Sequence, residues 1–184
     1  MSSGERSGAA GNLARLYREA IRRHAAHPVG YRQPIEATHR HDEYNPLCGD
    51  RVEIRLRVAG DTVAAAAFDG EACAICMASA SLLCSLAPGR TITGLRQLND
   101  SLQEALDGAV GARLARDRDA VGAGLAGDRG QGPLLQQDLP QELEPLLGVR
   151  PYPSRIRCAT LPWTAAVVAL SGATDDRGLD PATD

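Results

Sequence analysis

The sequence of 184 residues contains no lysine, so all 20 of its basic residues are arginines. Without lysine, the chain cannot form a Schiff base with a substrate and cannot supply the lysine of a phosphate-binding P-loop. Aspartate and glutamate total 23, and the formal net charge of −3 leaves no excess of cations to displace counterions from a nucleic acid. We therefore expect no nucleic-acid partner.

Long hydrophobic runs are also missing. The run at residues 165–170, for example, is far shorter than the about 20 residues that a membrane-spanning helix needs. Residues 1–12 lack the charged and then hydrophobic pattern of a secretory signal. We therefore expect a cytoplasmic protein with no membrane partner. Because 43% of its residues are hydrophobic, the chain can form the core of one domain.

Cysteine is present in an odd number, at Cys48, Cys73, Cys76, Cys84 and Cys158. In a chain without a secretory signal, this number disfavours a set of disulfides. It favours reduced thiols that serve metal or sulfur chemistry. Burial as small hydrophobic side chains is the alternative explanation for each of them.

Hydrophobic spacing predicts the elements of the first part of the chain. Hydrophobic side chains recur at helical spacing across residues 13–24, with Asn12 before them as a candidate N-cap and Pro28 after them. Residues 32–43 are polar and fit either an edge strand or a loop. Across residues 52–68, alternation of hydrophobic and charged side chains around a Gly-Asp turn predicts a β-hairpin with one solvated face.

Three helices are expected after the hairpin. The first is rich in alanine, serine and leucine and begins near Cys73. Leucines at helical spacing between residues 95 and 106 mark the second, with Thr91 or Thr93 as its cap. The third covers residues 153–170.

The order of these elements predicts an α+β domain, with a small three-stranded antiparallel sheet and helices packed on one side of it. Pro162 is expected near the start of the last helix, where proline is tolerated. We expect a single domain at residues 11–171, a disordered N-terminus at 1–10 and a disordered tail at 172–184. The many glycines at about 107–133 predict a mobile insertion.

Three cysteines and one aspartate have positions that suit a metal site. Cys48 and Asp50 lie in a Pro/Gly turn before a predicted strand. Cys73 and Cys158 lie near the starts of helices, where the positive end of the helix dipole favours thiolate. Three thiols and a carboxylate would complete a four-coordinate zinc site, although their spacing matches no zinc-finger pattern. A turn contact is the alternative role of Asp50.

Three segments carry a family resemblance: NPLCGD, FDGEACAICMASAS and RIRCATLPW. They resemble the three cysteine motifs of the U-type iron–sulfur cluster assembly family, whose branches include IscU, the N-terminal part of NifU, and SufU. The resemblance extends over residues 12–170. It implies that Cys48, Asp50, Cys73 and Cys158 hold either zinc or a nascent iron–sulfur cluster, and that the cysteines accept sulfur from a cysteine desulfurase.

Two differences from the IscU branch make the chain more similar to the SufU branch. Arg157 stands immediately before the last cysteine, where the scaffold branch that resembles IscU carries a histidine, and the glycine-rich insertion is of the SufU kind. The resemblance then implies a zinc-dependent sulfur acceptor that works with a SufS-type desulfurase and supplies a downstream cluster scaffold or apoproteins. A non-enzymatic scaffold that binds a [2Fe–2S] cluster or iron is the alternative.

Cys48 is our candidate for the sulfur acceptor. Its Pro/Gly loop can swing outward, whereas Cys73 and Cys158 are anchored on helices and can keep the metal; the resemblance indicates the same residue. Zinc would hold the acceptor sulfur deprotonated while protecting it. Asp50 is then the weaker ligand, because it offers a hard oxygen among soft sulfurs.

The other candidates have lesser roles. Cys76 follows Cys73 by about one helical turn, where SufU-like chains more often have serine, and is a possible auxiliary ligand. Arg155 and Arg157 flank Cys158 and could favour its thiolate. A redox pair of Cys73 and Cys76 is disfavoured, because no thioredoxin-like alternation of strands and helices is predicted. Cys84 is expected in the core. Ser79 and Ser81 are expected to lack a nearby histidine base, so a hydrolase is not supported.

Overall fold

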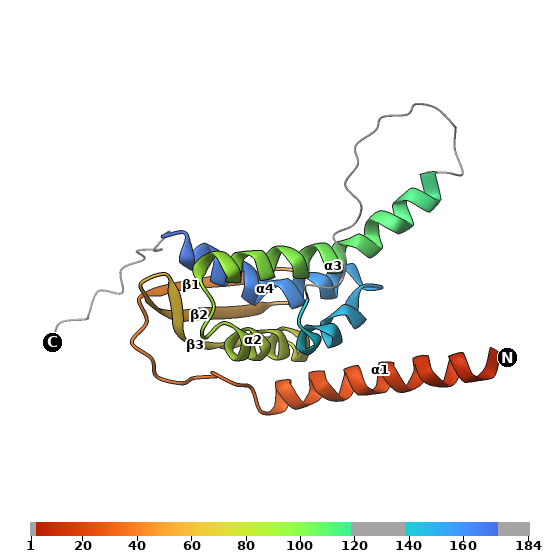
Figure 1. The fold of residues 1–184 in the computed structure, drawn as a ribbon, viewed down its shortest axis with the longest axis horizontal. Helices are drawn as coiled ribbons and strands as arrows, with labels where there is room; N and C mark the ends of the chain where they lie inside the picture. The colour runs from red at the N-terminus through yellow and green to blue at the C-terminus, as the bar shows by residue number, and fades with distance from the viewer. Residues whose placement is uncertain (1–2, 119–138, 173–184) are drawn as a thin grey trace.

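The computed structural model describes residues 3–118 and 139–172 (Figure 1). Its elements are α1 (Ser3–Ala26), β1 (His39–Asn45), β2 (Asp50–Ala59), β3 (Thr62–Glu71), α2 (Ala74–Leu86), α3 (Ile92–Arg118), the 3-10 helix η2 (Gln141–Val149) and α4 (Pro153–Leu170). The strands form one antiparallel sheet in the order β1-β2-β3. The predicted α+β class and three-stranded sheet are confirmed, and η2 is an element that the sequence did not predict.

Helices cover one face of the sheet, because buried hydrophobic and more exposed charged side chains alternate along β2. Val52, Ile54 and Leu56 are buried, whereas Arg51 before them and Arg57 after them are exposed. Helix α4 packs on β1 and β2, and α2 packs on β3. In Figure 1, α1 lies along α2 and α3 lies along α4, so these two helices form the outer part of the domain.

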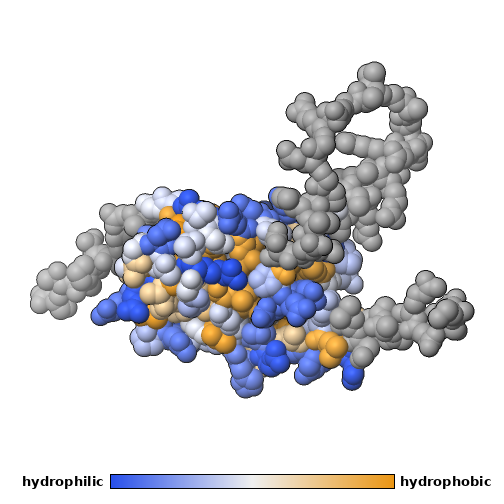
Figure 2. Space-filling view, viewed as in Figure 1, coloured by the Kyte–Doolittle hydropathy of each residue, from blue (hydrophilic) through white to orange (hydrophobic). Residues whose placement is uncertain are grey.

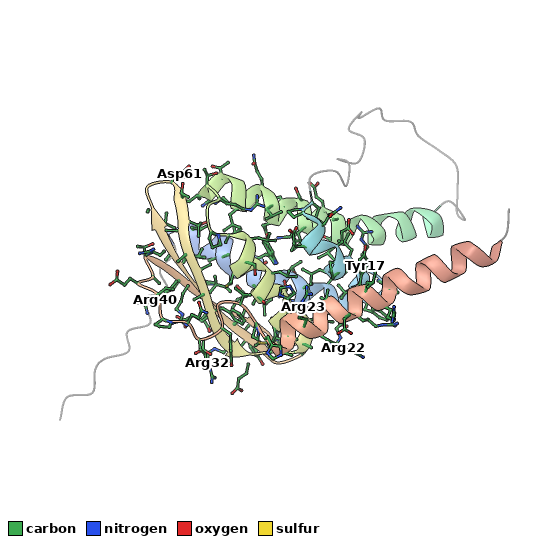
Figure 3. All side chains as sticks on the ribbon, turned by 60° about the horizontal axis from the view of Figure 1, so that its bottom comes forward. Tyr17, Arg22, Arg23, Arg32, Arg40 and Asp61 are labelled. Atoms are coloured by element: carbon green, nitrogen blue, oxygen red, sulfur yellow. The ribbon has the colours of Figure 1, made fainter. Side chains whose placement is uncertain are left out.

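The strands follow the predicted pattern closely. The hairpin turns at Gly60 and Asp61, the second of which is labelled in Figure 3. The segment that fitted an edge strand or a loop forms β1 from His39 onward, at the edge of the sheet. Helix α2 begins directly after Cys73, as predicted. Thr91 caps α3, because its hydroxyl accepts a hydrogen bond from Gly94 N–H at 3.0 Å.

Two helix boundaries differ from the prediction. Helix α1 begins at Ser3, so the prediction of Asn12 as its N-cap is wrong; the alanines shortly before Asn12 and the leucine and alanine after it are strong helix formers, and the helix continues through it. The helix therefore includes residues 3–10, for which the sequence predicts disorder. Helix α3 extends to Arg118, into the predicted insertion. The remainder of that insertion and the tail from residue 173 lie outside the described residues.

Polar contacts attach α1 to the rest of the domain. Tyr17, labelled in Figure 3, donates a hydrogen bond to the Glu144 carboxylate of η2 at 2.9 Å. His24 Nδ1 lies 2.8 Å from Ser81 Oγ, which also accepts the N–H of Val29 at 2.9 Å. The expectation that Ser81 lacks a nearby histidine is therefore wrong. Because Ser81 is completely buried, the pair holds α1 against α2 and does not present a nucleophile to a substrate.

Pro162 lies in the middle of α4, so the prediction that it lies near the start of the helix is wrong. A proline at this position has no N–H for the carbonyl group of Cys158, four residues earlier. Contacts with α2 support the helix here. Ser79 donates a hydrogen bond to the carbonyl of Ala159 and accepts one from Nε1 of Trp163 at 3.0 Å, and all three residues are buried.

Ser79→Ala is expected to lower the free energy of unfolding by about 1–3 kcal/mol, because the buried N–H of Trp163 loses its acceptor. Urea or thermal unfolding measures this change. Ser85→Ala is the control, since Ser85 is exposed and its hydroxyl bonds only to the carbonyl of Ser81 within the same helix. Equal losses in the two variants would contradict a specific role of Ser79 in joining α2 to α4.

Within residues 3–118 and 139–172, no helix is both long enough and hydrophobic enough to cross a membrane. On the face drawn in Figure 2, hydrophilic side chains are interspersed with smaller hydrophobic areas. Such a mixture is usual for exposed protein surface.

Candidate metal centre

The candidate site lies where the loop between β1 and β2 meets the starts of α2 and α4. Gly49 has a φ of 77°, a left-handed conformation that suits glycine, and its N–H donates to the carbonyl of Asn45 at 2.9 Å. The resulting tight loop exposes Cys48, whereas Asp50 is only 2% exposed. The Pro/Gly turn thus directs two candidate ligands from the end of one hairpin toward the helices.

Three of the four predicted ligands form a close group. Ligand atoms of Cys48, Asp50 and Cys158 all lie within 4.8 Å of one another, and the two sulfurs are 3.3 Å apart. It is the one group of three or more such side chains among the residues that the structure describes. Cys158 comes from α4 and is completely buried. A donor from far along the chain therefore meets the two donors of the loop.

Cys73, the fourth predicted ligand, lies beside this group and is not part of it. It is the N-cap residue of α2, and its backbone N–H donates to Asp50 Oδ1 at 2.7 Å. Its thiol is partly buried and also takes part in the hydrogen bonding of Asp50. The structure thus brings Cys73 into contact with the site through Asp50.

Asp50 is a buried carboxylate whose surroundings favour its charged form. Burial by itself acts to raise the pKa of Asp50. Hydrogen bonds from the thiols of Cys48 and Cys158 and from the backbone of Cys73 outweigh burial and hold this pKa below its ordinary value. The second carboxylate oxygen, Oδ2, is buried without a hydrogen-bond partner. Coordination of a cation would satisfy this oxygen, so the donor set fits a metal.

The sulfurs also suit zinc. Two thiolates at Zn–S distances of about 2.3 Å and a tetrahedral angle lie about 3.8 Å apart. Cys48 and Cys158 are already 3.3 Å apart, so only a small separation is required. Burial, followed by hydrogen bonds with Asp50 and Cys48, raises the pKa of the Cys158 thiol well above its ordinary value. A bound cation would displace that thiol proton.

The remaining cysteines are buried in α2. Cys76 is completely buried, and this burial, with the nearby Asp50 and Cys73, raises the pKa of its thiol well above the ordinary value. It lies near the site but outside the close group of donors. Cys84 is 4% exposed and belongs to the hydrophobic core, as predicted.

Of the two arginines that flank Cys158, Arg155 is the one that faces the thiols. The pKa of Arg155 is raised, mainly by the charge of Cys73 and also by hydrogen bonding to Cys158. Arg155 and Arg157, the two arginines expected to favour the Cys158 thiolate, are both exposed. Asn45 was not among the predicted site residues, and its place directly before a proline in the loop was the available signal.

Comparison with known proteins identifies the family. Residues 16–123, more than half of the chain, match the model of the NifU-like N terminal domain. The chain therefore belongs to this family, the U-type iron–sulfur cluster assembly proteins. Within the family it belongs to the SufU branch, as its relatives indicate.

Two curated relatives and one solved structure describe this relationship. The chain is 30% identical over 154 residues to the zinc-dependent sulfurtransferase SufU of Bacillus subtilis (strain 168), with 84% of this chain and 88% of that protein aligned. It is 27% identical over 158 residues to the iron-sulfur cluster assembly scaffold protein IscU of Streptococcus pyogenes serotype M1, with 86% and 84% aligned. A nitrogen-fixing NifU-like protein (N-terminal) from Brucella abortus has the same fold, with a TM-score of 0.62, 20% identity, and 83% and 90% of the two chains covered.

Proposed function

We propose that this protein is a zinc-dependent sulfur acceptor, which receives persulfide sulfur from a cysteine desulfurase during iron–sulfur cluster assembly. The observation that carries the proposal is the close group of Cys48, Asp50 and Cys158, in which one exposed loop thiol shares a cation site with two buried donors. The similarity to a SufU that is named a zinc-dependent sulfurtransferase supports the same function. Cys48, Asp50, Cys73 and Cys158 would hold the zinc. Bound zinc would keep the cysteine sulfurs deprotonated.

Cys48 is the proposed acceptor, because its thiol is exposed on a loop that lies outside the core. Its thiolate attacks the terminal sulfur of the persulfide on the desulfurase cysteine. The sulfur–sulfur bond of the donor breaks, the desulfurase cysteine leaves as a thiolate, and Cys48 becomes the persulfide. No external oxidant or reductant is needed. Cys158 and Cys73, which are anchored at helices, would hold the metal while Cys48 accepts sulfur.

The proposed partner is a SufS-type desulfurase, and a downstream cluster scaffold or apoproteins are the proposed recipients of the sulfur. The exposure of Cys48 supports transfer between proteins, since a donor persulfide must reach its sulfur directly. We propose the cytoplasm as the location of this transfer.

A scaffold that binds a nascent [2Fe–2S] cluster is the second candidate. The similarity to an IscU scaffold and the presence of Cys76 near the site favour it. Such a cluster needs two ligands on each iron, and Asp50 is a weak one. Arg157 cannot contribute, because guanidinium stays protonated and offers no acceptor.

Metal content and absorption of protein purified without oxygen distinguish the two candidates. We expect about one zinc ion per chain and little visible absorption, because the donor set suits tetrahedral zinc. A brown protein that keeps its cluster in the presence of zinc, and loses it on Cys76→Ser, would replace the acceptor function with the scaffold function.

Arg157→His is expected to raise the amount of retained cluster at least about twofold after anaerobic reconstitution with iron and sulfide, because imidazole can ligate iron where guanidinium cannot. Visible absorption after removal of unbound iron measures retention. Arg157→Gln is the matched control, since it removes the charge without adding a strong ligand. Equal retention in the two variants would show that the residue before Cys158 does not limit cluster binding.

A further inference from the structure

Asn45 is a buried polar residue at the centre of the candidate site. It is the last residue of β1, pairs with Asp50 across the sheet, and is 0% exposed. A buried amide is unfavourable unless its oxygen and nitrogen both find partners. Its oxygen atoms contact the loop that carries Cys48, and its side-chain nitrogen contacts the sulfur of Cys158.

The oxygen atoms of Asn45 hold the Cys48 loop. Its side-chain Oδ1 accepts the N–H of Leu47 at 3.1 Å. Its backbone carbonyl accepts the N–H of Cys48 at 3.3 Å and that of Gly49 at 2.9 Å. The loop thus folds around Asn45 in an Asx turn. Leu47 is 74% exposed and Cys48 is exposed, so these bonds restrain a segment that packing leaves largely free.

The nitrogen of the same side chain faces Cys158. Because Oδ1 is oriented by the N–H of Leu47, Nδ2 is directed to the other side, where it lies 3.8 Å from the sulfur of Cys158. An N–H group beside a thiolate stabilises its charge and lowers the electron donation of that sulfur to a metal. Asn45 is therefore in a position to influence both Cys48 and Cys158.

We propose that Asn45 is a positioning residue that links release of the acceptor Cys48 to retention of the metal by Cys158. The inference rests on the proposed zinc-dependent function. Oδ1 keeps the Cys48 loop closed over the site until a donor arrives. Nδ2 faces the Cys158 sulfur and holds it in position for the metal when Cys48 leaves.

Two substitutions separate these two contacts. Asn45→Asp keeps an oxygen for the N–H of Leu47 but directs a second oxygen, not a donor, at Cys158. Asn45→Ala removes both contacts. Asn99 provides matched controls, because it is a buried asparagine, 5% exposed, on α3, bonded to Asp100 and Gln103. Asn99→Asp and Asn99→Ala make the same chemical changes away from the site.

The first measurement is the rate of alkylation of Cys48 by iodoacetamide in the metal-free full chain, at the same alkaline pH for every variant. We expect Asn45→Ala to react about fivefold faster than the wild type, because the loop loses a hydrogen bond that restrains it. Asn45→Asp should react at close to the wild-type rate. Both Asn99 variants should match the wild type.

The second measurement is the sulfur-to-metal charge-transfer band of the cobalt-loaded chain. Asn45→Asp and Asn45→Ala should shift this band to longer wavelength, because the Cys158 sulfur loses its N–H donor. The Asn99 variants should leave it unchanged, whereas a merely structural loss would lower stability without moving the band. If Asn45→Ala does not fold, the band of Asn45→Asp decides the test.

The inference is overturned if Asn45→Ala is alkylated at the wild-type rate, or if the band of Asn45→Asp does not move. The proposed function still stands in that case, provided that the wild type binds the metal. A wild-type chain that binds neither zinc nor cobalt overturns the proposed function, and the inference with it, before any variant is compared. Faster alkylation of Asn45→Ala together with a shifted band in Asn45→Asp supports the inference.

Discussion

Cys158→Ala is expected to lose the zinc that the wild type holds at about one ion per chain. Cys158 is completely buried and is the one donor in the close group that does not come from the β1–β2 hairpin, so its removal leaves that group with one exposed thiol and the Asp50 carboxylate. The loss of affinity should exceed the about 10–100-fold that removal of an outer-shell partner costs. Elemental analysis measures the bound zinc.

Thermal unfolding provides a second readout for the same variant. Metal binding to a folded site contributes directly to folding free energy, so a chelator should lower the melting temperature of the wild type. It should change that of Cys158→Ala little. Cys84→Ala is the control, because Cys84 is a core thiol that is not one of the candidate ligands. Equal zinc in the wild type and Cys158→Ala would remove Cys158 from the ligand set.

Cys48→Ala is expected to abolish stimulation of a partner desulfurase while leaving the fold intact. The substitution removes the proposed acceptor sulfur, so transfer has no nucleophile, and it deletes an exposed loop side chain with no place in the core. Desulfurase turnover with and without each variant measures the effect. Far-ultraviolet circular dichroism checks the fold.

Cys84→Ala is again the matched control. It should keep the stimulation of the desulfurase, with a loss of about 1 kcal/mol of stability from its place in the core. If Cys48→Ala remained active, the acceptor role would pass to Cys73 or Cys158. Loss of activity in both variants would instead indicate a general effect of losing a thiol from this domain.

Local patterns explain which elements were predictable. The alternation along β2 and the glycine-containing turn after it predict the hairpin, because the period of two and the turn are properties of adjacent residues. The start of α2 at Cys73 is local for the same reason. Two predictions failed where a boundary depends on more than its neighbours. Asn12 lies inside α1, and Pro162 lies inside α4 because α2 supports that helix through Ser79.

The α+β class, the hairpin and the cysteine motifs can be recognised in the sequence, because each depends on short-range periodicity or on a few neighbouring residues. The contact between Cys158 and Cys48, which are 110 positions apart, arises only in the folded chain, since packing of α4 on β1 and β2 brings them together. The same packing buries Asn45 against Cys158 and leaves Cys73 beside the group. These contacts join residues distant in the sequence, and no local pattern encodes their distances.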